Sequence, residues 1–263
     1  MSTPPSLRIS YDPVAPNLGH AIGGIWRLTF RRVFSPKQFL VLVGLLVLFA
    51  LLSLVNVRER NAVQFLEWTT DFYLTALVPV TAFLAGGGAI REDMKGVAVD
   101  YILTRPVRRS VFVPAKFLCH LLCVELLQLL PLAVLFGVGN FHHIPGLAEA
   151  LPRLLLAQGA TVAAFLALGY LGGAITSRYL VLGIFYAGVV EVGFGQIPIQ
   201  LNKLSVLHHV RTIVADLFTG TNEGVGAWLP SLAILGLFVV VWIGVATALF
   251  AVQEFAGQRP KDA

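Results

Sequence analysis

Four polar side chains interrupt long apolar stretches of the sequence and are its first candidates for chemistry. Glu125 and Gln128 lie three residues apart in one stretch, and Glu191 and Gln196 lie five apart in another. A charged side chain at the centre of a bilayer costs about 2.5–3.5 kcal/mol on insertion scales, so each carboxylate should face a cavity or a partner, or carry a proton. We therefore predict that these residues line a translocation pathway or gate. The alternative is a protonated carboxyl that only satisfies a neighbouring helix.

Glu191 is the stronger of the two carboxylate candidates because its surroundings predict a break in the helix. It is surrounded by residues that interrupt helices: Gly188, Gly193, Gly195 and Pro198. Exposed backbone inside a bilayer is tolerated only where protein or water lines it. A break at Glu191 would therefore place the carboxylate beside such a lining.

The overall composition excludes a soluble globular domain. Of the 263 residues, 57% are hydrophobic and only 13% are charged, against about 25% charged in soluble domains. Such apolar content is also the opposite of a disordered chain. Cys119 and Cys123 lie one helical turn apart in an apolar stretch, where we expect them to be buried as small hydrophobic residues. Together with His120 they lack a fourth ligand, so no metal site is predicted.

The apolar stretches predict an all-α membrane protein. A helix needs about 20 mostly apolar residues to cross the hydrocarbon core. We predict six spans, at 39–57, 72–90, 117–141, 154–177, from Tyr179 through Glu191, and 229–252. Residues 1–38 and 253–263 then flank a transmembrane domain of residues 39–252. The glycines at 86–88, 169 and 173 predict a close approach of two of these helices, with a hinge as the alternative.

The basic residues predict the orientation of the spans. With six spans, the side that holds both termini and the loop 91–116 carries 14 of the 19 Lys and Arg residues. Both termini are therefore expected in the cytoplasm, and the protein in a plasma (bacterial inner) membrane. The same bias explains the net charge of +5, so no nucleic-acid partner is needed.

Two amphipathic stretches lie outside the predicted spans. Apolar residues recur at helical spacing between Ile22 and Phe34, while Arg27, Arg31 and Arg32 fall off that stripe. This pattern predicts a helix lying on the cytoplasmic leaflet, with an ordinary protein-docked helix as the alternative.

The second amphipathic stretch lies in the outer segment 191–226. Apolar residues at helical spacing across 204–217 predict a short outer-side helix there. Two histidine pairs, at 142–143 and 208–209, also fall on the outer side and are expected to be solvated loop residues.

The loop 91–116 between the second and third spans combines charged residues with a short apolar helical pattern. Val97, Tyr101 and Ile102 belong to that pattern, and Pro106 ends it because the residue before a proline is pushed out of the α region. Such a helix is too short to cross a membrane. It can only contact lipid headgroups or a cytoplasmic partner.

This loop resembles the signature loop of ABC type-2 transporter permeases. The resemblance rests on Glu92, Gly96, the run Asp100-Tyr101-Ile102-Leu103-Thr104-Arg105-Pro106-Val107, Arg109 and Lys116. It implies a coupling helix that docks on a separate ATPase subunit through Glu92, Asp93, Gly96, Asp100, Tyr101, Ile102, Arg105, Pro106 and Arg109. A solvated connector whose arginines hold lipid headgroups is the alternative.

The resemblance also implies the working assembly, in which two permease copies, identical or different, bind two ABC ATPase subunits within membrane lipid. ATP and Mg²⁺ belong to the ATPase, because this chain lacks the phosphate-binding motif G-x-x-x-x-G-K-[ST] and needs no cofactor of its own. We expect a non-enzymatic subunit that moves a substrate by alternating access. Substrate, direction of transport and the need for an outer-side accessory protein stay open.

Two other functions are alternatives to transport. A mechanotransmitting subunit of the same architecture would pass ATPase motion to an outer-side protein without moving a substrate. An intramembrane enzyme is disfavoured, because H-E-x-x-H and G-x-S-x-G are both absent from the sequence.

Overall fold

Every regular element in the described part of the chain is helical. The computed structural model describes residues 18–34, 36–58, 60–94, 109–194, 200–215, 217 and 228–252. Its elements are α1 (Leu18–Val33), α2 (Pro36–Asn56), α3 (Ala62–Trp68), η1 (Thr69–Leu77), α4 (Val78–Asp93), α6 (Arg109–Phe141), α7 (Leu147–Ile175), α8 (Tyr179–Tyr186), η2 (Ala187–Phe194), η3 (Gln200–Leu204), α9 (Val206–Val214) and α11 (Trp228–Val252).

Four of these helical stretches are long and apolar enough to cross a membrane. They are Ala62–Asp93, Ser110–Phe141, Leu147–Ile175 and Trp228–Val252, and two shorter apolar stretches are Val43–Asn56 and Tyr179–Gly193. The prediction of an all-helical chain with several membrane-length helices is therefore confirmed for the described residues.

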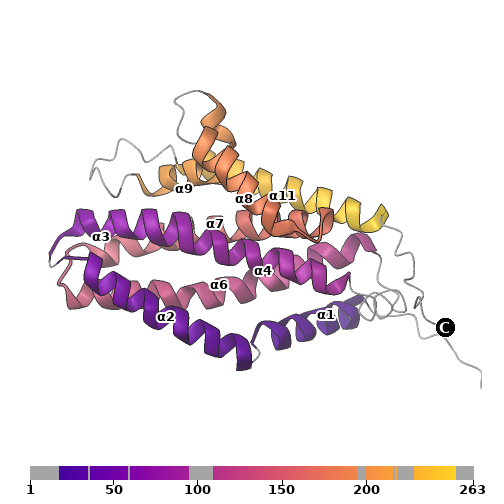
Figure 1. Cartoon of the computed structure of the whole chain (residues 1–263), viewed down its shortest axis with the longest axis horizontal. Coiled ribbons are helices and arrows are strands. Elements are labelled where there is room, and N and C mark those ends of the chain that lie inside the picture. The colour runs from indigo at the N-terminus through magenta and orange to yellow at the C-terminus, as the bar shows by residue number, and fades with distance from the viewer. Residues whose placement is uncertain are drawn as a thin grey trace, which may run out of the picture.

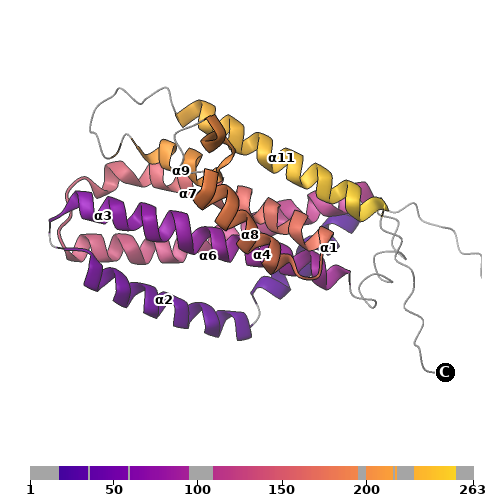
Figure 2. The same cartoon turned by 45° about the horizontal axis from the view of Figure 1, so that its top comes forward.

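The long helices lie side by side along the long axis of the molecule (Figure 1). The central helix is α7, which packs against α4 and α11, and α6 contacts α1, α2, α7 and α11. Figures 1 and 2 place α2 at one side of the bundle and α11 at the opposite side. The end of α4, the start of α6 and the end of α11 share one end of the bundle (Figure 1).

Glycines allow α4 and α7 to pack backbone against backbone. A Cβ built on Gly86 would lie 2.4 Å from the carbonyl oxygen of Leu166, and one on Gly169 would lie 2.4 Å from that of Phe83. A Cβ on Gly173 would lie 2.7 Å from a backbone oxygen of α4. No larger residue fits at these distances, so the predicted close approach is confirmed.

The helices extend beyond the predicted spans at several ends. The second span, predicted at 72–90, belongs to a helix that runs from Ala62 to Asp93, and the third, predicted to begin at 117, belongs to α6, which includes Arg109. Hydropathy locates the apolar centre of a helix, whereas caps set its ends. Asn61 illustrates this, since its side chain accepts a hydrogen bond from the backbone N–H of Gln64 at 3.0 Å.

The fifth predicted span differs from expectation at Glu191. Instead of breaking there, the helix continues from α8 into the π-helical segment η2 and reaches Phe194. A π-helix widens the hydrogen-bonded turn by one residue, which changes the direction of the side chains without ending the helix. The short helices η3 and α9 follow, in the region where the sequence predicts a short helix.

Candidate functional site

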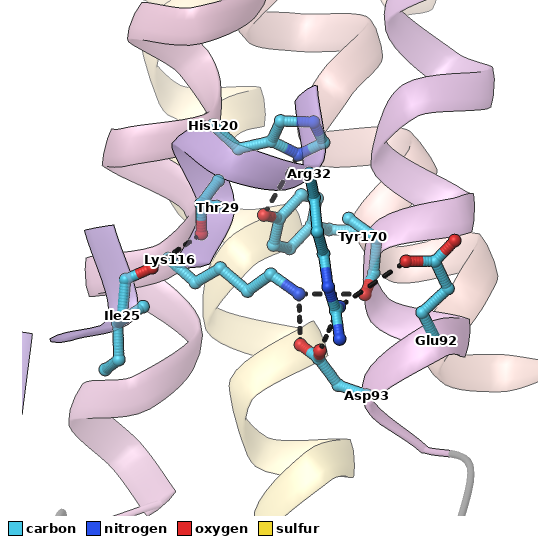
Figure 3. Close-up of polar contacts among 9 residues, drawn as sticks. Ile25, Thr29, Arg32, Glu92, Asp93, Lys116, His120 and Tyr170 are labelled. Carbon is cyan, nitrogen blue, oxygen red and sulfur yellow. Dashed lines mark hydrogen bonds and ion pairs between the residues drawn. The ribbon is translucent and has the colours of Figure 1, made fainter. Parts of the chain in front are cut away.

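A cluster of four charged side chains joins α1, α4 and α6 where the chain leaves α4. We call Arg32, Glu92, Asp93 and Lys116 the charged cluster (Figure 3). Arg32 Nη1 lies 3.1 Å from Asp93 Oδ1 and 3.4 Å from Glu92 Oε2. Lys116 Nζ donates to Asp93 Oδ2 and, at 2.9 Å, to the carbonyl oxygen of Ala89. Asp93 therefore accepts from two cations that belong to two different helices.

Burial divides the charged cluster into an inner pair and an outer pair. The side chains of Asp93 and Lys116 are 7% and 6% exposed, whereas those of Arg32 and Glu92 are 49% and 56% exposed. A buried charge is tolerated only when it is paired and hydrogen-bonded. The buried charges of the inner pair are thus tolerated only because they are paired and hydrogen-bonded. The charges of the outer pair remain screened by water.

The inner ion pair brings together the two helices that flank residues 95–108. Asp93 is the last residue of α4, and Lys116 lies two turns into α6. Above this pair, the ring of His120 lies 3.3 Å from the hydroxyl of the buried Tyr170 of α7 (Figure 3). Polar contacts at this end of the bundle therefore reach from α1 to α7.

The predicted coupling residues fall into different environments. Glu92 is exposed, whereas Asp93 is occupied by the charged cluster and has almost no surface left for a docking partner. Arg109 is the first residue of α6. The other predicted coupling residues lie outside the described residues: Gly96, Asp100, Tyr101, Ile102, Arg105 and Pro106.

A second set of polar contacts lies among the long helices, and we call it the interior polar network. The hydroxyl of Tyr73 lies 2.6 Å from Gln158 Oε1 and 2.9 Å from the backbone oxygen of Gln128. Gln158 Nε2 donates to Glu125 Oε1 at 2.6 Å, and Gln128 Nε2 donates to Thr81 Oγ1. These bonds join η1, α4, α6 and α7.

Glu125 uses one carboxyl oxygen in this network and leaves the other unused. Its Oε2 is buried and has no hydrogen-bond partner among the described residues. Within the same residues, no lysine, arginine or histidine lies in ion-pair distance of Glu125. Glu125 therefore contacts α7 through Gln158. The pathway role of Glu125 and Gln128 stays a prediction, as does the alternative of a protonated carboxyl that only satisfies a neighbouring helix.

Glu191 lies at the N-terminus of α9, where it accepts three hydrogen bonds. Its Oε2 accepts from Ser205 Oγ at 2.5 Å and from the backbone N–H of Leu207 at 3.1 Å, and its Oε1 accepts from that of Val206 at 3.1 Å. Ser205 Oγ also accepts from the backbone N–H of His208 at 3.0 Å. The carboxylate therefore caps a helix, where negative charge is favoured by the helix dipole.

This cap ties the π-helical segment η2 to α9. Glu191 is only 8% exposed, and its known partners are internal groups of the chain. Its predicted role in a pathway or gate stays a prediction, as does that of Gln196, which lies outside the described residues.

The histidines at 208–209 lie on α9, not in a loop. His209 is 3% exposed, with Nε2 2.9 Å from the carbonyl oxygen of Lys203 and Nδ1 3.3 Å from Ser231 Oγ, so the expectation of a solvated residue is wrong for it. Burial, followed by the nearby His209 and Lys203, lowers the pKa of His208. No group of three or more metal-binding side chains occurs within the described residues.

Two of the residues in these polar contacts could have been singled out from the sequence. Gln158 is a polar residue inside the fourth apolar stretch, and Ser205 directly precedes a helix, the position of an N-cap. Arg32 and Tyr73 gave no comparable signal, because their partners lie 61 and 85 residues away.

Comparison with known proteins adds no family assignment. No protein-family model matches the chain, and no curated protein matches it. The fold therefore defines the class only as an α-helical protein whose described residues include four helices suited to cross a membrane.

Proposed function

We propose that this chain is the permease subunit of an ABC transporter, in which a separate ATPase supplies the energy that moves a substrate. In this proposal α2 and the stretch α8–η2 cross the membrane along with the four long helices. Both termini and residues 95–108 then face the cytoplasm, and α1 lies on the membrane surface.

The observation that carries the proposal is the position of the permease-like loop between α4 and α6. The ion pair of Asp93 and Lys116 joins α4 and α6, the helices that precede and follow this loop in the sequence. A partner that pushes on the loop would therefore act on both helices together. This is the mechanical requirement of a coupling element, which must pass the motion of an ATPase to the spans.

Docking is tested by co-purification of the chain with ABC ATPase subunits that are expressed together with it. Replacing Tyr101 and Ile102 by Asp should abolish recovery of the ATPase with the permease. It should also abolish the ATP hydrolysis that the permease–ATPase complex carries out in liposomes. The matched control replaces Phe141 and His143 by Asp, because both are exposed at the other end of α6. Normal recovery of the ATPase by the Tyr101 and Ile102 variant would overturn the docking role of the loop.

The six-span count is tested by cysteine labelling in intact cells, in a background with Cys119 and Cys123 replaced by Ala. A reagent that cannot cross membranes should label Arg58→Cys and Lys203→Cys, which follow α2 and η2. Ser6→Cys and Arg178→Cys, which precede α2 and α8, should react only after permeabilisation. Ser6 and Arg58 flank α2, and Arg178 and Lys203 flank the stretch α8–η2. If both positions that flank one of these helices are labelled from outside, that helix does not cross the membrane.

The mechanotransmitting alternative makes a different prediction for the same purified complex. It expects an outer-side protein to bind the complex in stoichiometric amounts and ATP hydrolysis to continue without movement of a substrate. ATP-driven movement of a substrate in liposomes that contain only permease and ATPase would exclude it.

A further inference from the structure

The three arginines of α1 are directed to two different sides of the helix. Arg32 reaches the acidic end of α4 and lies within 3.4 Å of both Asp93 and Glu92. Arg27 and Arg31 are exposed, and no carboxylate of the described residues lies within ion-pair distance of either one. Because α1 contains no acidic residue, the positive charge of Arg27 and Arg31 is not neutralised on their own helix.

Two exposed aromatic rings lie on the same face of α1 as these arginines. Phe30 and Phe34 are 40% and 44% exposed, and their rings stack with centroids 5.4 Å apart. At 100° per residue, Arg27, Phe30, Arg31 and Phe34 fall within about 100° of the helix circumference. The opposite side of the helix carries the buried Thr29.

We propose that this face of α1, formed by Arg27, Phe30, Arg31 and Phe34, binds anionic phospholipid. The arginines pair with lipid phosphates, and the two phenylalanines enter the boundary between headgroups and acyl chains. Charge decides in favour of this occupant, since a face with two unneutralised cations and two apolar rings fits an anionic, amphipathic surface. The inference rests on the proposed position of α1 at the membrane, but it requires neither transport nor an ATPase.

The charged cluster also couples a lipid bound at α1 to the ends of α4 and α6. Arg32 ties α1 to Asp93, and Asp93 is paired with Lys116 on α6. A lipid that holds α1 in place therefore also favours one position of the helix ends that flank residues 95–108. The lipid acts on the face of α1 formed by Arg27, Phe30, Arg31 and Phe34, and the charged cluster passes this restraint to α4 and α6.

The test uses the purified full chain in mild detergent, titrated with phosphatidylglycerol or phosphatidylcholine, with bound lipid counted by native mass spectrometry. Each arginine near an anionic surface contributes about fivefold in affinity, so Arg27→Gln with Arg31→Gln should weaken phosphatidylglycerol binding by about thirtyfold. Phosphatidylcholine binding should change little. The loss should shrink at high salt, where surface charges are screened.

Two controls remove positive charge elsewhere. Arg32→Gln removes one positive charge from the same helix but from its other side, and should retain phosphatidylglycerol at wild-type affinity. Arg58→Gln with Lys203→Gln removes two exposed charges distant from α1, and covers the case in which Arg32→Gln displaces the helix.

Three outcomes would overturn the proposal. The first is unchanged phosphatidylglycerol binding by the Arg27 and Arg31 variant. The second is an equal loss with the distant control, which would mean that net charge alone attracts the lipid. The third is a change in oligomeric state without loss of lipid, which would assign this face to a second copy of the chain.

Discussion

Lys116 on α6 and Asp93 at the end of α4 form a buried ion pair, and the half-exposed Arg32 of α1 forms a second ion pair with the same carboxylate. Three helices that are distant in sequence therefore meet at one carboxylate. The pair also explains why Asp93 differs from its neighbour Glu92, which stays exposed and contacts only Arg32 among the described cations.

The first prediction concerns the stability contributed by this pair. Lys116→Met should lower the free energy of unfolding by about 3–5 kcal/mol, because it leaves the buried Asp93 without its main partner. Glu92→Gln should change it by less than about 1 kcal/mol, since that ion pair is exposed. Both values can be measured by thermal or denaturant unfolding in detergent.

A second variant separates loss of the pair from loss of the lysine side chain. Asp93→Asn combined with Lys116→Met removes both charges and should recover much of the lost stability. If the double variant is as unstable as the sum of the single variants, the two residues do not act as a pair.

The second prediction concerns the glycine contact between α4 and α7. Gly86→Ala places a methyl group 2.4 Å from the backbone oxygen of Leu166, so the helices must separate. We expect destabilisation of at least about 1–3 kcal/mol, the usual cost of overpacking. Gly236→Ala is the control, since a Cβ there meets no atom within 4 Å, and it should be neutral or stabilising. Equal melting temperatures for the two variants would contradict the close contact.

The third prediction concerns the interior polar network. Tyr73→Phe and Gln158→Met each remove one partner of the 2.6 Å hydrogen bond, so their effects should not add. A double-mutant cycle should give a coupling energy of about 0.6–1.7 kcal/mol, which are the average and the maximum found for hydrogen bonds between membrane helices. Tyr179→Phe with Gln158→Met serves as the control and should be additive within about 0.5 kcal/mol. A coupling energy of zero for the first pair would show that the bond contributes nothing to stability.

The fourth prediction separates the capping role of Glu191 from its proposed role in a pathway. Glu191→Ala removes three hydrogen bonds, so the amides of Val206 and Leu207 should exchange with deuterium faster. Loss of a helix cap costs about 1 kcal/mol, or roughly fivefold in exchange. Glu149→Ala, which alters an exposed carboxylate on α7, should leave this exchange unchanged.

The conservative variant Glu191→Gln then decides what the charge does. It keeps an oxygen that can accept hydrogen bonds, so most of the protection of α9 should remain. Reduced transport with intact protection would support a pathway role, whereas wild-type transport would leave Glu191 as a cap alone.

The sequence by itself determined the helical class of the chain and the position of its most apolar helices. The predicted span 229–252 differs from α11, Trp228–Val252, by one residue at its start. The glycines on α4 and α7 likewise predict close helix contacts from the sequence alone. Both properties are local, because hydropathy sums over neighbouring residues and a glycine lacks a side chain wherever it is placed.

Only the tertiary structure decided which polar groups meet. Arg32, Asp93 and Lys116 come from three helices, and their contact depends on how each helix is rotated about its axis and how far it is shifted along it. The π-helical segments η1 and η2, which carry Tyr73 and Glu191, alter that rotation by an amount that apolar periodicity does not reveal. Packing between distant segments sets these angles and shifts, so a one-dimensional pattern contains the candidates for the polar contacts but not their pairing.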